Sequence, residues 1–256
     1  MDLRSVGTLA LLAPVFLGSD LIQRILIAPA SKLLAGRRDL VLTRWQRLLA
    51  RVVLFILRHP GGVRVAALPR IPAEPGVLVL MNHQSLLDIP LVIASMHGVY
   101  PLIVARTRYG RGIPLVSHMA RLYRYPLVEP RATLRGELER LRREGASSSH
   151  PIVLFPEGTR TRTGRIGRFK TLGLTTILAA RRWRVYVVVA DGVWRWARFN
   201  DFLKKLSMIR VRVECGGPFE SPPPGSDPLL FVAQMRSVMT DMLAELRREP
   251  GSEAAG

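Results

Sequence analysis

The chain contains a single cysteine in 256 residues. One cysteine excludes an intrachain disulfide and any metal site built from several cysteines. Disulfides are rare in reducing compartments, so a single cysteine is consistent with a protein of a reducing compartment. Cys215 ends the alternating run 209–214, where a cysteine is usually a small packed residue, so we do not expect it to be a nucleophile.

Acidic residues are also scarce: there are 19 Asp and Glu against 38 Lys and Arg, which gives a formal net charge of +19. Of the basic residues, 34 are arginines, so the charge does not titrate away near neutral pH. Residues 106–170 alone hold 15 basic and 5 acidic side chains. The partner is therefore expected to be anionic, and composition allows nucleic acid, an anionic bilayer or phosphorylated substrates. The chain has no zinc-finger spacing, ribonucleoprotein motif or basic-aromatic repeat, so no nucleic-acid partner is expected.

The hydrophobic N-terminal segment, 6–34, lacks the uncharged run of about 20 residues that a membrane-spanning helix needs. Asp20 and Arg24 interrupt it, and its longest uncharged stretch, 5–19, is 15 residues long. Three interpretations are open: a membrane-embedded or re-entrant helix pair, a cleaved signal peptide, and a core helix. We favour membrane association, and whether the segment spans the bilayer stays open.

A second helix is predicted over 44–58. Its four arginines share an arc of about 60° when successive residues are placed about 100° apart, and apolar residues fill the remainder. These arginines are Arg44, Arg47, Arg51 and Arg58. Such a helix can lie in a bilayer interface with its apolar side in the acyl boundary, and the alternative is an amphipathic helix packed on the domain. Because His59-Pro60-Gly61-Gly62 breaks the helix, we expect the membrane-associating helices to occupy 1–60.

Beyond this break, predicted strands and helices alternate, which favours an α/β fold with a largely parallel sheet flanked by helices. Strands are predicted at 77–81, 102–105, 152–155, 185–190 and 209–214. Helices are predicted from about Ser85 and at 134–143, 172–182 and 229–248. We therefore expect an α/β domain over 61–249 and a disordered tail over 250–256.

Two polar motifs each follow one of the predicted buried strands. The first runs from Asn82 to Asp88 and reads Asn-His-Gln-Ser-Leu-Leu-Asp. The second runs from Phe155 to Thr161 and reads Phe-Pro-Glu-Gly-Thr-Arg-Thr. In open α/β sheets, ligands bind in the crevice at the carboxyl ends of the strands. A base with an acidic partner and an arginine-bearing loop are therefore expected to face one cavity, as in an active site.

The two motifs together resemble the glycerolipid acyltransferase family, whose members carry a His-x4-Asp motif introduced by Asn and then a Phe-Pro-Glu-Gly-Thr-Arg motif. Here these are Asn82, His83 and Asp88, followed by 155–160, and the resemblance covers roughly 75–192. It implies acyl transfer from acyl-CoA or acyl-carrier protein to a lysophospholipid or glycerol phosphate, with no metal cofactor. It also implies a protein at the cytosolic face of the cell membrane, with an anionic membrane surface as a partner.

Two other blocks depart from the family pattern. The intermediate block usually has a glycine and a proline ahead of a basic residue, and here 112–114 precedes Arg121, Arg124 or Arg131. The last block usually ends its strand with Val-Pro, whereas 187–192 contains no proline. Both blocks bear on substrate binding, so the acceptor is the part of the function that the resemblance determines least.

Acyl transfer to an alcohol needs a base, because an alcohol is almost wholly protonated at neutral pH. Histidine suits this task, and a carboxylate on its other ring nitrogen would fix the tautomer. We predict His83 as the base, placed in the turn, and Asp88 as its partner in the first helical turn. The alternatives are that His83 is an ordinary structural histidine and that Asp88 only caps the helix, since 85–88 matches a capping-box pattern. Ser85 is disfavoured as a nucleophile because it lacks the Gly-x-Ser-x-Gly elbow.

The second motif is predicted to bind substrate. Gly158 permits close backbone approach, and Arg160 offers a planar fork for bidentate phosphate binding. Glu157 is expected to orient Arg160 or to bond an acceptor hydroxyl, and the alternative is a plain turn with a surface ion pair. The other predicted binding residues are Thr159, Arg168, Lys170 and Asn82, the last of which could orient the turn.

The predicted reaction is the acylation of 1-acylglycerol 3-phosphate to phosphatidate. Another lyso-lipid or glycerol 3-phosphate is the alternative acceptor. From a different class, a non-enzymatic basic protein that binds anionic lipid or nucleic acid stays open.

Overall fold

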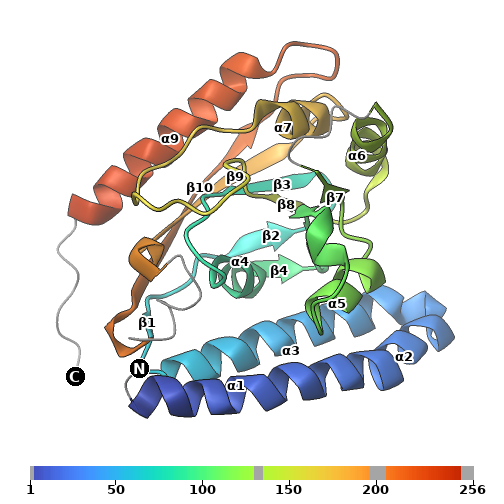
Figure 1. Cartoon of the computed structure of the whole chain (residues 1–256). Helices are drawn as coiled ribbons and strands as arrows, with labels where there is room; N and C mark the ends of the chain where they lie inside the picture. Colours follow the sequence, from blue (N-terminus) through green and yellow to red (C-terminus); the bar gives the residue numbers. More distant parts are fainter. Residues whose placement is uncertain (1–2, 130–134, 197–205, 249–256) are drawn as a thin grey trace.

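The computed structural model describes residues 3–129, 135–196 and 206–248, with a central sheet covered on its faces by helices (Figure 1). The helices are α1 (Leu3–Ile22), α2 (Ala28–Leu33), α3 (Arg38–Arg58), α4 (Asp88–Ser95), α5 (Val116–Leu122), α6 (Arg135–Ser147), α7 (Thr171–Leu178) and α9 (Leu229–Arg248). The strands are β1 (Arg64–Val65), β2 (Ile71–Ala73), β3 (Val77–Met81), β4 (Met96–Gly98), β5 (Leu102–Ile103), β6 (Ala105–Arg106), β7 (Leu127–Val128), β8 (Ile152–Leu154), β9 (Arg184–Asp191) and β10 (Arg210–Glu220).

The main sheet has six strands in the order β1-β10-β9-β3-β8-β5. Strands β9, β3, β8 and β5 are parallel, and β10 runs antiparallel to β9. Two short parallel pairs, β2 with β4 and β6 with β7, lie beside this sheet. The predicted α/β fold with a largely parallel sheet flanked by helices is therefore confirmed.

Strand β3 lies in the middle of the sheet, and all five of its residues are buried. Successive side chains point to opposite faces of a strand. Leu78 and Leu80 join the core under α7 and α9, whereas Val77, Val79 and Met81 join the core under α4. This two-sided packing fixes the point at which the first polar motif leaves the sheet.

The other predicted elements agree with the structure except at their ends, but the predicted strand 102–105 is divided into β5 and β6, which pair with different strands. Helix α9 covers the predicted 229–248, but β10 continues to Glu220, beyond the predicted end at 214. Helix α4 begins at Asp88, because Ser85 first forms a turn in which its Oγ accepts a hydrogen bond from Leu87 N. The predicted tail at 250–256 lies outside the described residues.

Helices α1 and α2 are joined by a π-helical turn, Gln23–Ile27, and run beside α3. We refer to residues 3–58 as the N-terminal hairpin, which lies along one side of the α/β domain (blue in Figure 1). By length and composition, its stretch Arg4–Leu33 could cross a membrane. Only 17% of the most apolar part of this stretch is buried.

The stretch from α1 to α2 is apolar on the outside and polar on the inside, the reverse of a helix on the surface of a soluble protein. Its exposed apolar residues are Val6, Leu11, Leu17, Leu21, Ile22, Ile25, Leu26, Leu33 and Leu34. Its buried polar residues are Ser5, Thr8, Ser19, Gln23 and Ser31. The polar side is therefore the one that contacts the rest of the protein, together with the partly buried Leu9, Leu12, Phe16 and Ile27.

Gln23 forms the centre of this inward polar side. Its Oε1 accepts a hydrogen bond from Trp45 Nε1 at 3.0 Å, and its Nε2 lies 2.8 Å from His118 Nδ1. One turn earlier, Asp20 Oδ1 accepts a hydrogen bond from Leu115 N at 2.7 Å. These contacts tie the apolar helix both to α3 and to the start of α5.

Helix α3 differs from the prediction that its apolar side lies in the acyl boundary. Most of that side is buried by protein, as the alternative of a helix packed on the domain requires. The buried apolar residues are Leu42, Trp45, Leu49, Ala50, Leu54, Ile56 and Leu57. Leu48 and Phe55 are exposed beside Arg51, and Arg47 instead donates to the carbonyl of Gly98. The outward apolar surface of the hairpin therefore comes mainly from α1 and α2.

Candidate active site

His83 lies in the turn after β3, and Asp88 is the first residue of α4, as predicted. The Nδ1 atom of His83 is 2.8 Å from Asp88 Oδ2. The same oxygen accepts hydrogen bonds from Gln84 N at 2.6 Å and Ser85 N at 2.8 Å. The two interpretations of Asp88 are thus not exclusive, because one oxygen both contacts the imidazole and caps the turn.

The contact with Asp88 leaves Nε2 as the nitrogen of His83 that can accept a proton. The His83 side chain is 19% exposed, whereas that of Asp88 is completely buried. The imidazole ring also packs against Phe155, with the ring centroids 4.5 Å apart. A histidine held by a buried carboxylate and by an aromatic ring has the geometry of a general base.

The second motif holds the backbone of His83 on both sides. His83 N donates to Glu157 Oε1 at 3.0 Å, and Thr161 N donates to His83 O at 2.8 Å. The other oxygen of Glu157, Oε2, accepts a hydrogen bond from Gly167 N at 2.8 Å. The two motifs therefore form one hydrogen-bonded unit.

This arrangement corrects the expected role of Glu157. We expected its carboxylate to orient Arg160 or to bond an acceptor hydroxyl, but both oxygens accept backbone N–H groups. The residue is only 4% exposed. Because a buried carboxylate must be satisfied by nearby donors, Glu157 stabilises the site from within and does not line the cavity.

Asn82 also faces away from the cavity, although we predicted that it binds substrate. Its Nδ2 donates to Ala190 O at 2.9 Å, and its Oδ1 accepts from Ala190 N at 2.8 Å. This side chain joins the end of β3 to the end of β9. The structure thus supports the suggestion that Asn82 orients the turn.

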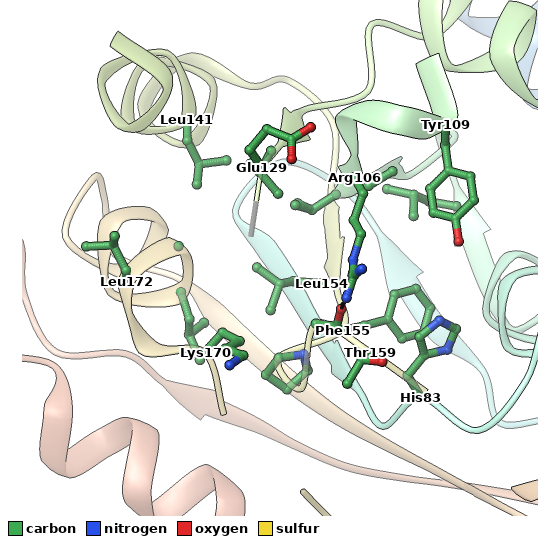
Figure 2. A pocket seen from close by; sticks show the side chains of 18 of the residues that line it. His83, Arg106, Tyr109, Glu129, Leu141, Leu154, Phe155, Thr159, Lys170 and Leu172 are labelled. Atoms are coloured by element: carbon green, nitrogen blue, oxygen red, sulfur yellow. Dashed lines mark hydrogen bonds between the residues drawn. The ribbon is translucent and has the colours of Figure 1, made fainter. Parts of the chain in front are cut away.

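A cavity of about 490 Å³ opens beside His83 (Figure 2). Of the predicted site residues, it is also lined by Gly158, Thr159, Arg160 and Lys170. Arg168 is exposed and is not among its lining residues. The volume lies within the range of about 300–1,000 Å³ that is typical of small-molecule sites.

The cavity has two chemically different regions. Figure 2 shows Leu141, Leu154 and Leu172 on the side away from His83, with Glu129 beside Leu141 at its edge. The basic residues that line the cavity are Arg106, Arg108, Arg160, Arg162 and Lys170, against the acidic Glu129 and Glu137. The site therefore joins an apolar chamber to a region of positive charge, with His83 at one side.

Sequence reasoning missed Arg106, which ends β6 and projects into the cavity (Figure 2). Its guanidinium donates two hydrogen bonds to the carbonyl of Gly158 in the second motif. Of the basic residues expected in the intermediate block, Arg121 instead donates to Gly110 O, and Arg131 lies outside the described residues. Its position in the sequence could have indicated Arg106 as a site residue, because it follows a predicted strand just as the two motifs do.

A model of the family described as Acyltransferase matches residues 62–188, which contain both motifs. The chain belongs to the acyltransferase family. The crystal structure of the 1-acyl-sn-glycerophosphate (LPA) acyltransferase PlsC from Thermotoga maritima is similar to it, with a TM-score of 0.71 and 17% sequence identity. That similarity covers 98% of this chain and 97% of the other. No curated protein sequence matches the chain significantly.

The acyltransferase is thus an enzyme, and the expectation of a non-enzymatic basic protein is set aside. Within the described residues, no group of three or more His, Cys, Asp and Glu side chains could hold a metal ion.

Burial raises the pKa of Glu157, and the hydrogen bonds from His83 N and Gly167 N offset this only in part. Between the ordinary pKa of a glutamate and the raised one, the native acyltransferase binds more protons than the unfolded chain. Its free energy of unfolding should therefore decline as pH rises through this window and then level off. Glu157→Gln should lack this slope, which chemical denaturation of both proteins from pH 4 to pH 8 would detect.

Glu74→Gln is the matched control for this measurement. Glu74 is an exposed carboxylate paired with Arg184, and its replacement should leave the slope of the wild type in place. An identical pH dependence in Glu157→Gln and the wild type would contradict the assignment.

Proposed function

We propose that the protein transfers a fatty acyl group from acyl-CoA or acyl-carrier protein to the free hydroxyl of 1-acylglycerol 3-phosphate, giving phosphatidate. The observation that carries this proposal is the cavity beside His83, which combines a base, a cluster of cations and an apolar chamber. A lyso-phosphatidate needs cationic groups for its phosphate, and an acyl chain needs apolar surface. The similarity to a protein named as an LPA acyltransferase points to the same acceptor.

In this reaction, His83 Nε2 takes the proton from the acceptor hydroxyl while its oxygen attacks the carbonyl carbon of the thioester. Asp88 holds Nδ1 and stabilises the imidazolium that forms. The new ester bond forms as the carbon–sulfur bond breaks, and the proton on His83 passes to the departing thiolate. The enzyme returns to its starting state without an acyl-enzyme, and no step calls on a metal ion.

The phosphate of the acceptor would be held by Arg160, Arg106 and Lys170. All three line the cavity, and Arg106 already contacts the second motif through Gly158 O. A guanidinium can donate two parallel hydrogen bonds to a phosphate, so arginines suit this task better than a point charge alone. Gly158, at φ +65, adopts a backbone conformation that favours glycine and brings Arg160 to the cavity.

The acyl chain would occupy the apolar chamber under α6 and α7. Leu141 is 3% exposed and lines this chamber together with Leu154 and Leu172. The depth of the chamber below the thioester would then set the preferred chain length.

The N-terminal hairpin would place this site at the cytosolic face of the membrane. Leu17, Leu21 and Ile25, spaced four residues apart, are 61%, 57% and 60% exposed. Burying this apolar side in the acyl region would remove it from water, and the exposed Arg24 and Lys32 would meet anionic headgroups. The acceptor would then lie in the bilayer while the donor arrives from the cytosol.

His83→Ala should lower acyl transfer by at least about 10²–10⁴-fold, because the hydroxyl loses its base. The assay uses labelled acyl-CoA and acyl-carrier protein against lysophosphatidate, glycerol 3-phosphate and a phosphate-free lyso-lipid. His97→Ala, at an exposed histidine that does not line the cavity, is the control and should retain activity. If the wild type acts only on another acceptor, the proposed acceptor is wrong but the mechanism stands. Full activity of His83→Ala would contradict the mechanism.

Leu141→Trp should shift the donor preference toward shorter chains. Each methylene that no longer fits should cost about 0.8 kcal/mol of binding, visible in kcat/KM across donors of graded length. Leu229→Trp, at a half-exposed position outside the cavity, is the control. If Leu141→Trp has the same preference for donor chain length as the wild type, the acyl chain does not bind in this chamber.

Leu17→Lys combined with Ile25→Lys should release the protein from vesicles, because a lysine in the hydrocarbon region costs about 3 kcal/mol. Flotation with anionic vesicles at low and high salt measures the effect. The wild type should stay bound at high salt, and Leu230→Lys, at an 86% exposed residue of α9, should behave like it. Loss of the wild type from the vesicles at high salt would mean that charge, and not apolar area, holds the protein.

A further inference from the structure

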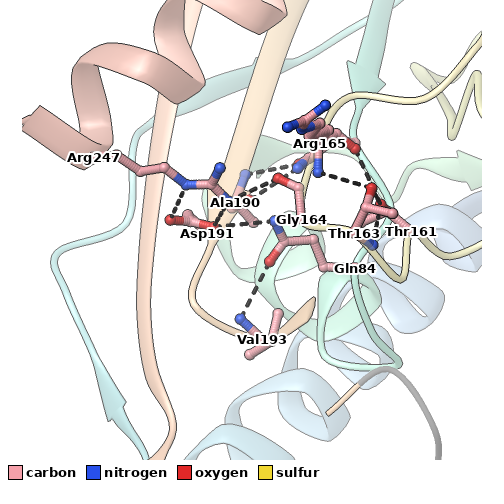
Figure 3. Close-up of polar contacts among 10 residues, drawn as sticks. Gln84, Thr161, Thr163, Gly164, Arg165, Ala190, Asp191, Val193 and Arg247 are labelled. Atoms are coloured by element: carbon pink, nitrogen blue, oxygen red, sulfur yellow. Dashed lines mark hydrogen bonds and ion pairs between the residues drawn. The ribbon is translucent and has the colours of Figure 1, made fainter. Parts of the chain in front are cut away.

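Asp191 and Arg247 form an ion pair beside the side chain of Gln84 (Figure 3). Asp191 ends β9, and Arg247 lies in the last turn of α9. Arg247 donates through Nε to Oδ2 at 2.9 Å and through a terminal nitrogen to Oδ1 at 2.7 Å. This is the bidentate arrangement in which a guanidinium and a carboxylate bind most specifically.

The pair reaches His83 through Gln84, the next residue in the chain. Gln84 is fully buried, and its Oε1 accepts a hydrogen bond from Val193 N at 3.2 Å. That contact fixes the amide so that Nε2 donates to Asp191 Oδ1, at 3.3 Å. Asn82, on the other side of His83, is bonded to Ala190. Both neighbours of His83 are therefore held by the segment 190–193, in which Arg247 binds Asp191.

Arg247 also reaches the loop that follows the second motif. The terminal nitrogen that contacts Asp191 donates to Gly164 O at 2.7 Å. Eleven positions earlier on α9, Arg236 Nε donates to Gly167 O at 3.0 Å, and Gly167 N in turn donates to Glu157. The C-terminal helix thus contacts both halves of the site from outside the cavity.

The ionised state of the pair agrees with its geometry. Burial raises the pKa of Asp191, but the hydrogen bonds from Arg247 and Gln84 outweigh it, so that the pKa lies below the ordinary value. The carboxylate is therefore available as an acceptor for both partners at neutral pH.

We propose that Asp191 and Arg247 are positioning residues for the reaction: through Gln84 they hold the turn that aims His83 at the acceptor hydroxyl. Neither residue lines the cavity. The proposal rests on the proposed function, in which His83 is the base. It gives the C-terminal helix a part in catalysis through Arg247, which lies 56 residues after Asp191 in the chain.

A positioning role and a merely structural role of Asp191 and Arg247 predict different effects of substitution. The Arg247 side chain is 37% exposed and that of Asp191 is 11% exposed, so removing one partner also lowers stability. A displaced catalytic group can cost about 100-fold in rate. A positioning role therefore predicts a lower kcat in variants that remain folded, whereas a merely structural role predicts a lower melting temperature with kcat unchanged.

The test compares Arg247→Gln, Asp191→Asn and Arg247→Lys with the wild type in kcat, in KM for both substrates and in melting temperature. Arg247→Gln and Asp191→Asn should lower kcat about tenfold or more, while KM changes less than about twofold. Arg247→Lys should recover part of kcat, because it restores the charge without the bidentate contact. Hydrogen exchange of residues 82–88 should be faster in the variants with low kcat.

Glu74→Gln is the matched control, because it removes the Arg184–Glu74 ion pair of 2.6 Å at the opposite end of the same strand. It should leave kcat unchanged. His83→Ala separates the two proposals: if it stays fully active, the proposed mechanism with His83 as the base fails. If it is inactive while Arg247→Gln and Asp191→Asn keep wild-type kcat, or lose activity only through KM, the positioning role fails. Should Arg247→Gln not fold, Asp191→Asn and Arg247→Lys decide by the same criteria.

Discussion

The hydrogen bond between His83 N and Glu157 Oε1 is the contact on which the rest of the site depends. It exists because β3 and β8 are parallel neighbours, so that the two motifs leave the sheet at the same edge. The buried carboxylate then serves two backbone donors that would otherwise lack partners. A polar group of this kind stabilises only one arrangement of the loops, since any other leaves a charge buried without donors.

Local patterns were enough to predict the elements that carry the site. The apolar runs 77–81 and 152–155 are short and continuous, as buried parallel strands are, and both form strands. The turn that separates His83 from Asp88 was predicted because five helical positions would point the two side chains apart, and the structure brings them to 2.8 Å. These features depend on neighbours within a few residues.

Other features depend on residues that are distant in the chain. Asn82 and Glu157 were expected to face substrate, but their side chains bind backbone groups at Ala190 and Gly167, which sequence spacing does not reveal. The apolar side of α3 has the composition of an interfacial helix, and only the fold shows that protein covers most of it. The contact between Asp191 and Arg247 carries no local signal, because each is an ordinary charged residue at the end of its own element.

The inward polar side of α1 has a consequence for the order of events during synthesis. Gln23 leaves the ribosome long before Trp45, and its other partner, His118, follows 95 residues later. Until nearly half of the chain has been made, the amide lacks at least one of these two partners and favours water or headgroups over hydrocarbon. The growing chain would thus hold its first helix near the surface of the bilayer, which is the plane that the proposed membrane placement requires.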